Sequence, residues 1–269
     1  MSDLPFTSST EAGELGGHEG RTGRPPWRRR ALRALAVALI LAGAIALADA
    51  AVTLLWQEPF SALYAALRQD HLGGVLRRVE HAAPTPAETH TLASLSDERR
   101  RIEFLAGELE HRANDGDPVG RIVIPRIGAS FVMVKGTNTE DLKSGPGVFP
   151  ETPFPGRGHT TAVAGHRTTY LAPFRHIDEL SRGSMIRLEM PYARFTYSVI
   201  GTRVVWPSNV QAAVADVGYS RVVLSACTPA FSAEKRLLVF ARLVRIDPRG
   251  AARILPGGAA ARPILVPAS

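Results

Sequence analysis

Cys227 is the only cysteine in the 269-residue chain, and it ends an apolar segment. A solitary thiol cannot form an internal disulfide or a multi-cysteine zinc site, which leaves packing, intermolecular pairing or nucleophilic chemistry. The runs 221–226 and 237–244 are typical of buried strands, and the linker between them has the length of a hairpin loop. Antiparallel pairing predicts Cys227 beside Arg236, whose permanent charge favours a thiolate or an oxyanion. The alternative is that this cysteine packs as a small hydrophobe.

A histidine in a similar setting is the second candidate group. The segment TTAVAGHRTTY predicts a short strand, a tight turn at Gly165, and His166 at the rim of a sheet. Only His159, His166 and His176 of the eight histidines fall in the strand-rich region. One interpretation is a Cys–His pair, in which imidazole raises the thiolate fraction and later protonates a leaving amine. The other is a three-histidine metal site, although these spacings match no usual zinc pattern.

The elements that must position these groups predict a mainly β fold. Eight short strands favour a closed eight-stranded β barrel with short helices, because closure removes exposed sheet edges. One intervening helix is expected at residues 173–180, with Pro173 in its first turn. The strands are expected at about 121–127, 130–134, 146–149, 160–165, 184–190, 194–205, 221–227 and 236–245.

The N-terminal region predicts a membrane anchor. Residues 34–56 form a 23-residue apolar stretch broken only by Asp49. As a helix this stretch is long enough to cross a hydrocarbon core of ~30 Å. By the positive-inside rule, the arginines before it place the N-terminus in the cytoplasm and the rest of the chain outside. The alternative is a cleaved signal peptide, because residues 48–50 (Ala-Asp-Ala) have the form of a cleavage site. The arginines are Arg21, Arg24, Arg28, Arg29, Arg30 and Arg33, against Arg68 alone shortly after the stretch.

The predicted organisation has five parts. Residues 1–30 are a disordered cytoplasmic leader, 31–56 the transmembrane anchor, 57–114 membrane-proximal helices and a linker, 115–247 the catalytic barrel, and 248–269 a flexible tail. The net charge of +7 and the isoelectric point near 10.1 do not indicate nucleic-acid binding, because six arginines flank the membrane segment and no nucleic-acid motif appears.

Two helices and a linker are expected ahead of the barrel. Residues 60–82 have the pattern of an amphipathic helix, and residues 81–91 that of a linker. Residues 94–112 carry an apolar stripe at helical spacing, with Ser94 available as the N-cap.

Several segments in order resemble the sortase family, most closely the class E housekeeping type of high-GC Gram-positive bacteria. The resemblance covers roughly residues 115–247. It implies that His166 is the catalytic histidine, Cys227 the nucleophile and Arg236 the strand arginine. The chain departs from the family pattern Thr-Leu-x-Thr-Cys at two positions, which puts substrate contacts in question more than the chemistry. The segments are GRIVIPRIG, DLKSGPGVFPETPFPG, AVAGHRTTYLAPFRHIDEL, VVLSACTP and KRLLVFARL, and the departures are Val223 and Ala226.

The resemblance implies a membrane-anchored cysteine transpeptidase. It would cleave a Leu-Ala-x-Thr-Gly-like sorting signal of secreted proteins between Thr and Gly, and join the acyl group to a peptidoglycan precursor or a pilin lysine. No metal or other cofactor is expected, because the segment before the cysteine strand offers only Asp216 to a hard cation.

Three alternatives stay open. A hydrolytic cysteine peptidase would usually need a carboxylate or amide to orient the imidazole, and Asp178 is the nearby candidate. A non-enzymatic envelope protein would explain the anchor and the barrel. A metal-dependent envelope hydrolase would use the three histidines of the strand-rich region.

Overall fold

The computed structural model describes residues 26–55, 59–209, 211–254, 256 and 258–267. The chain divides into two compact units, Met1–Ala51 and Val52–Ser269. Most of the predicted leader, residues 1–25, lies outside the described residues, as does Trp56 at the end of the predicted anchor.

The first unit contains most of one long helix. Helix α1 spans Pro26–Leu55, and its segment Arg30–Ala51 has a hydropathy of 2.3. By length and composition this segment is a candidate membrane span, which agrees with the anchor expected from the sequence.

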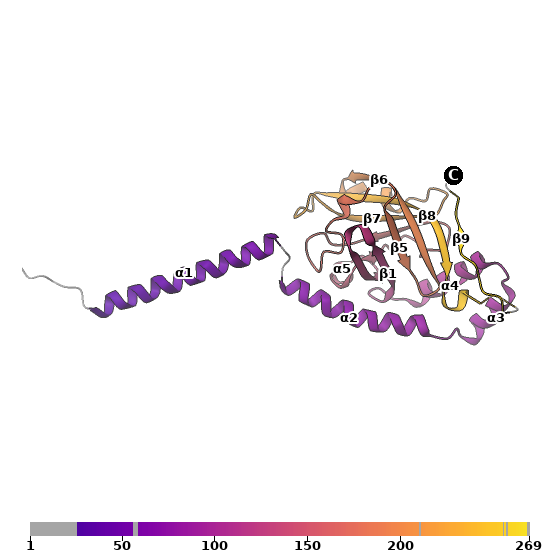
Figure 1. Ribbon diagram of the computed structural model, residues 1–269, viewed down its shortest axis with the longest axis horizontal. Coiled ribbons are helices and arrows are strands. Elements are labelled where there is room, and N and C mark those ends of the chain that lie inside the picture. The colour runs from indigo at the N-terminus through magenta and orange to yellow at the C-terminus, as the bar shows by residue number, and fades with distance from the viewer. Residues whose placement is uncertain (1–25, 56–58, 210, 255, 257, 268–269) are drawn as a thin grey trace, which may run out of the picture. The chain divides into compact units, whose positions relative to one another are not determined.

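The second unit is built on a closed β barrel (Figure 1). The strand order is β6-β5-β1-β2-β3-β4-β7-β8, and β8 also pairs with β6, which closes the sheet. The prediction of a closed eight-stranded barrel is confirmed. The strands are β1 Pro118–Ile124, β2 Ala129–Lys135, β3 Gly147–Val148, β4 Thr160–Ala164, β5 Met185–Glu189, β6 Ala193–Val205, β7 Arg221–Thr228 and β8 Lys235–Pro248.

The barrel closes around one large apolar core. Residues of β6 alternate between buried and half-buried from Ala193 to Ile200, as expected when successive side chains point to opposite faces. In β7, six successive residues from Arg221 to Ala226 are buried, because both faces of this strand are covered. Side chains of the core include Ile122, Phe195, Val222, Leu224, Val239 and Ala241. This packing holds the ends of β4, β7 and β8 in fixed register.

Three helices precede the barrel strands. Helix α2 spans Pro59–His81, α3 Pro86–Ser94 and α4 Glu98–Arg112. The prediction of a linker at residues 81–91 is wrong, because most of this segment belongs to α3. The Thr85 side chain accepts a hydrogen bond from the Glu88 amide, and the Glu88 carboxylate accepts one from the Thr85 amide, so this capping box starts the helix.

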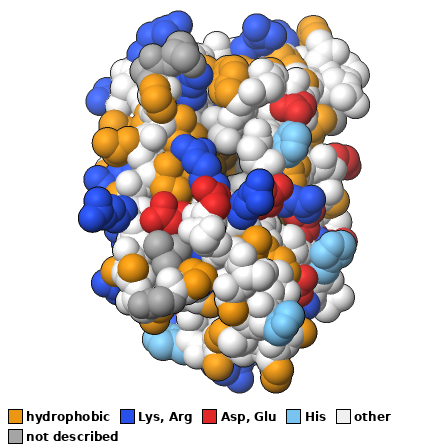
Figure 2. Space-filling view, turned by 90° about the vertical axis from the view of Figure 1, so that its right-hand side faces the viewer, with side chains coloured by type: hydrophobic (Ala, Val, Ile, Leu, Met, Phe, Trp, Pro, Cys, Tyr) orange, Lys and Arg blue, Asp and Glu red, His pale blue; other side chains and the backbone are white. Residues whose placement is uncertain are grey.

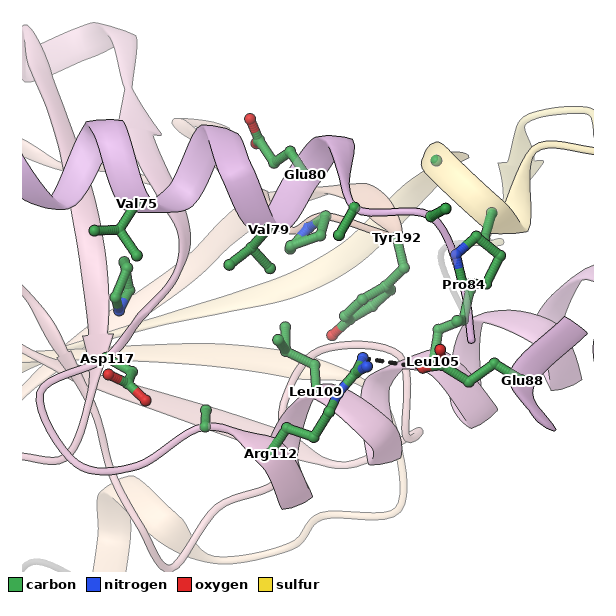
Figure 3. Close-up of a pocket in the computed structure, with 17 residues that line it drawn as sticks. Val75, Val79, Glu80, Pro84, Glu88, Leu105, Leu109, Arg112, Asp117 and Tyr192 are labelled. Carbon is green, nitrogen blue, oxygen red and sulfur yellow. Dashed lines mark ion pairs between the residues drawn. The ribbon is translucent and has the colours of Figure 1, made fainter. Parts of the chain in front are cut away.

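The start of α4 also differs from expectation. Ser94 ends α3 instead of capping α4, and the N-cap is Asp97, whose carboxylate accepts a hydrogen bond from the Arg100 amide at 2.9 Å. Glu88 of α3 pairs with Arg112 of α4 at 3.0 Å, the dashed contact in Figure 3. These helices and α2 border a largely apolar cavity of about 380 Å³, away from the candidate reactive groups.

The side-chain amide of Gln69 binds helix α2 to the barrel through hydrogen bonds. Gln69 Nε2 donates to the Val132 carbonyl at 2.9 Å and to the Ser144 carbonyl at 2.7 Å, and Gln69 Oε1 accepts from the Val132 amide at 2.7 Å. Leu72 and Leu76 are buried in a small cluster with Val132 on β2. The helix that follows the candidate membrane span is therefore a structural part of the barrel unit.

Residues 173–180, expected as a helix, form turns and only one 3-10 helix, η2 at Ile177–Glu179. Tertiary contacts override the local pattern here, because Phe174 is fully buried and its amide donates to the His166 carbonyl at 3.0 Å. Another short helix, α5 Thr139–Ser144, was not expected.

The C-terminal residues 248–269 contain a 3-10 helix, η4 Gly250–Ala252, and a short strand, β9 Ile264–Leu265, which pairs with β8. Arg101 of α4, itself buried, donates to the Ala251 and Ile254 carbonyls at 2.9 and 2.5 Å. On the face shown in Figure 2, basic and acidic side chains lie interspersed.

Candidate active site

Parallel pairing of β4 and β7 brings the histidine and the cysteine to the same end of the barrel. Each paired residue of β7 is 61 positions after its partner in β4, from Thr160 and Arg221 onward. The Gly165 amide extends the ladder by donating to the Ser225 carbonyl at 3.1 Å. The same register places His166, just past the end of β4, level with Cys227 on β7.

Antiparallel pairing places the arginine on the other side of the cysteine. Cys227 is the register partner of Arg236 in the β7–β8 hairpin, as the sequence predicts. Directly opposed residues of neighbouring strands share one face of the sheet. Arg236 Nη1 donates to the Ala233 and Lys235 carbonyls at 2.9 and 3.1 Å, so the guanidinium is turned toward the hairpin loop. In the described part of the chain, no carboxylate is paired with it.

His166 and Cys227 line one cavity of about 310 Å³. Both residues are half-buried, so each presents some surface to the cavity while the rest is held by the barrel rim. Exposed Phe231 and the two residues after it line the cavity from the β7–β8 hairpin. The other lining residues are Arg167, Thr168, Thr169, Ser232 and Ala233.

The imidazole of His166 is partly withdrawn from solvent. Burial lowers the pKa of His166 from its ordinary value, which favours the neutral ring. Its Nε2 is buried and has no hydrogen-bond partner among the described residues. The ring contacts that of Tyr170, with centroids 5.1 Å apart. A neutral imidazole with an unpaired nitrogen can accept a proton from a thiol and donate it later to an amine.

The backbone after His166 takes an unusual path. Tyr170, Leu171 and Ala172 are consecutive non-glycine residues with φ of 50°, 64° and 42°. The left-handed conformation costs an L-residue roughly 1–2 kcal/mol, so surrounding contacts must hold this turn. Ala172 is buried, and the Tyr170 ring lies near that of His166 and near that of Tyr64 of α2, whose centroid is 6.5 Å from that of Tyr170.

The other two histidines of the strand region lie elsewhere. His159 precedes β4 and pairs with Asp216 at 2.8 Å, whereas His166 follows that strand. Five strand residues separate two points by about 17 Å, too far for shared ligation. His176 pairs with Glu179 at 2.8 Å. Over the described residues, no group of three potential metal-binding side chains occurs, so the three-histidine site is not formed.

Asp178 does not orient the imidazole. Its carboxylate is ion-paired with Arg167 at 2.5 Å, and Arg167 also donates to the Thr228 hydroxyl at 3.1 Å. The peptidase alternative named this aspartate as its orienting group, and the structure gives that carboxylate another partner. Sequence reasoning missed Arg167, although it directly follows the histidine.

The two departures from the family pattern are buried. Val223 is fully buried in a cluster with Ala162 and Leu238. Ala226 is 3% exposed and belongs to the main core. Neither side chain lines the cavity of His166 and Cys227. The missing hydroxyls therefore alter the packing behind the site more than its accessible surface.

Comparison with known proteins agrees with this geometry. The family model described as "Sortase domain" matches residues 122–244. Sortase D of Bacillus subtilis is 27% identical over 173 residues, which are 63% of this chain and 82% of that protein. Sortase SrtE1 of Streptomyces coelicolor is 35% identical over 97 residues, which are 32% of this chain and 27% of that protein.

Among solved structures, sortase C from Clostridium perfringens SM101 superposes with a TM-score of 0.51 at 21% identity, over 65% of this chain and 98% of that one, a likeness of fold. The match of residues 122–244 covers most of the barrel, and it includes His166 just past the end of β4, Cys227 on β7 and Arg236 on β8. The chain is therefore similar to the sortase family over residues 122–244.

Proposed function

We propose that this chain is a cysteine transpeptidase in which Cys227, His166 and Arg236 perform the chemistry. The match of residues 122–244 to the sortase family model supports transpeptidation in general. The observation that carries the residue assignment is the shared cavity of His166 and Cys227, with Arg236 paired to the cysteine across the hairpin.

In the first half-reaction, the Cys227 sulfur attacks a backbone carbonyl carbon of the substrate. The proton of the thiol passes to the imidazole of His166, whose Nε2 has no hydrogen-bond partner among the described residues. Collapse of the tetrahedral intermediate breaks the carbon–nitrogen bond. The imidazolium then protonates the departing amine, which leaves a thioester on Cys227 and a neutral imidazole.

In the second half-reaction, an incoming amine attacks the thioester carbonyl and gives its proton to His166. The new amide forms as the carbon–sulfur bond breaks, and the sulfur leaves with the proton returned by the imidazolium. Arg236 holds the substrate carbonyl or stabilises the oxyanion in both halves, because it is a permanent cation without a carboxylate partner among the described residues.

The substrate we propose is a C-terminal sorting signal of the Leu-Ala-x-Thr-Gly kind in secreted proteins, cleaved between Thr and Gly. The acceptor is the amine of a peptidoglycan precursor or a pilin lysine. This assignment rests on the class E resemblance, which the 35% identity to Sortase SrtE1 supports over 97 residues. We further propose that α1 is an uncleaved anchor with a cytoplasmic N-terminus, since six arginines precede the apolar stretch. A mature N-terminus at Ala51 would show a cleaved signal peptide instead.

The decisive experiment is intact-protein mass spectrometry of the full chain in detergent micelles. The protein is mixed with a Leu-Ala-x-Thr-Gly peptide, with and without an acceptor amine. Wild type should gain the mass of the acyl portion ending at Thr, and the amine should convert this adduct into ligated peptide. Cys227→Ala should lose both adduct and product, whereas His166→Ala should acylate weakly and fail to transfer. Product formed by Cys227→Ala at the wild-type rate would refute the proposal.

A further inference from the structure

We propose that Arg167 is a positioning residue that holds the histidine-bearing end of β4 against the cysteine-bearing end of β7. The inference rests on the proposed function, since it concerns the spacing between His166 and Cys227. Arg167 directly follows the histidine, and its partner Thr228 directly follows the cysteine.

The guanidinium of Arg167 joins three segments of the chain. Its Nη1 donates to the Thr228 hydroxyl at 3.1 Å, its Nε donates to the Arg175 carbonyl at 3.2 Å, and its Nη2 pairs with Asp178 at 2.5 Å. The partners lie on β7, on the turn after Phe174 and on η2. One rigid side chain therefore fixes the end of β7 relative to the loop that follows β4.

Arg167 is buried, so its contacts are needed to compensate its charge. Its side chain is only 8% exposed, and a buried cation is costly unless it is paired and hydrogen-bonded. Asp178 neutralises the charge, and each of the three guanidinium nitrogens has a partner. Arg236 differs in this respect, because its guanidinium has no carboxylate partner among the described residues. Arg167 therefore acts through geometry, whereas the guanidinium of Arg236, the register partner of Cys227, keeps an uncompensated charge among the described residues.

The register explains why this clamp bears on the reactive pair. The contact from Arg167 to Thr228 spans 61 residues, the offset of the whole β4–β7 ladder. Backbone pairing ends with Gly165, one residue before His166. Beyond that point the Arg167 side chain replaces the ladder as the link between the two chain ends, so His166 and Cys227 lie between the last backbone hydrogen bond and the clamp.

Replacement by lysine tests the clamp, because an ammonium keeps the charge but cannot reach three partners in a plane. A displacement of about 1 Å between reacting groups can cost about 100-fold in rate. We expect Arg167→Lys to lower kcat by about 10- to 100-fold with little change in KM for the peptide. Thr228→Val removes the acceptor at nearly constant volume and should lower kcat in the same direction by a smaller factor.

The experiment measures steady-state transpeptidation by the full chain in detergent for Arg167→Lys, Thr228→Val and the double variant. Because both changes break the same contact, their effects on kcat should not multiply. The kcat of the double variant should lie within about threefold of that of the slower single variant. The matched control is Arg126→Lys, since the exposed Arg126 also donates to a carbonyl near η2, that of Glu179, at 2.9 Å. This control should keep wild-type kcat.

A second measurement separates the clamp from the proposed function. The pH dependence of Cys227 alkylation by iodoacetamide reports how closely the imidazole couples to the thiol, and it requires no turnover of peptide. In Arg167→Lys and in Thr228→Val this profile should move toward that of His166→Ala. A wild-type profile in both variants, or multiplication of the two kcat effects in the double variant, would overturn the proposal. Altered profiles in a chain that ligates no peptide would leave the clamp standing and refute the transpeptidase assignment.

Discussion

Gly165→Ala should destabilise the protein and disable the site, because the position before His166 has no room for a side chain. A Cβ there would lie 2.6 and 2.7 Å from two carbons of the Phe174 ring and 3.1 Å from a third. Ordinary van der Waals contact begins near 3.4 Å, so the ring or the backbone must move by roughly 1 Å. Phe174 is fully buried, so any movement of its ring must displace the side chains packed around it.

The expected cost follows from this overlap. Overpacking a close-packed core typically costs about 1–3 kcal/mol. For a domain of this size, each kcal/mol lowers Tm by roughly 2–4 °C, so Tm should fall by about 2–12 °C. The Phe174 amide also holds the His166 carbonyl. Moving that ring therefore displaces the histidine, and we expect kcat to fall by at least about tenfold.

The assay is thermal unfolding of the barrel followed by circular dichroism, together with peptide ligation. Gly201→Ala is the control, because Gly201 lies on β6 with no atom within 4 Å of its added Cβ. The added Phe174→Leu change should recover part of the activity of Gly165→Ala by shortening the opposing side chain. A Gly165→Ala protein with the Tm and kcat of wild type would refute the argument that Phe174 leaves no room for a side chain at position 165.

Three further predictions concern charge, protonation and the helix before the barrel. Arg236→Lys keeps the charge but loses the planar fork of the guanidinium, so kcat should fall at least tenfold with Tm unchanged. This fall corresponds to about 1.4 kcal/mol of transition-state stabilisation. Wild-type activity of the lysine variant would remove Arg236 from the site. Because burial lowers the pKa of His166, the unfolded chain takes up that proton first as pH falls, so the unfolding free energy should decline from about pH 6.5 down to the lowered pKa. His166→Asn should lack this part of the decline in urea titrations, and equal slopes for the two proteins would contradict the assignment. Gln69→Leu removes three hydrogen bonds and should cost about 1–3 kcal/mol or more, measured against the exposed Gln211→Leu as the control.

Local sequence patterns predicted most of the barrel and failed where tertiary contacts decide. All eight strands of the closed barrel were expected within a few residues of their observed positions, because their apolar runs are bounded by turn residues. The helix expected at residues 173–180 is absent, since Phe174 is drawn into the core beside Gly165. Helix α3 could have been recognised from its Thr-Pro-Ala-Glu capping box, which was taken for a linker.

The candidate site divides along the same line. The pairing of Cys227 with Arg236 was predictable, because a hairpin joins residues close in sequence and its loop length sets the register. The place of His166 was predictable only as a strand end, since a parallel ladder between strands 61 residues apart leaves no local signal of its register. The sequence indicates the contacts of Arg167 still less, because they depend on that ladder and on two loops beyond it. The structure therefore adds most for residues such as Arg167 that make contacts across the parallel ladder, and the proposed proton transfer between Cys227 and His166 depends on the spacing that such contacts set.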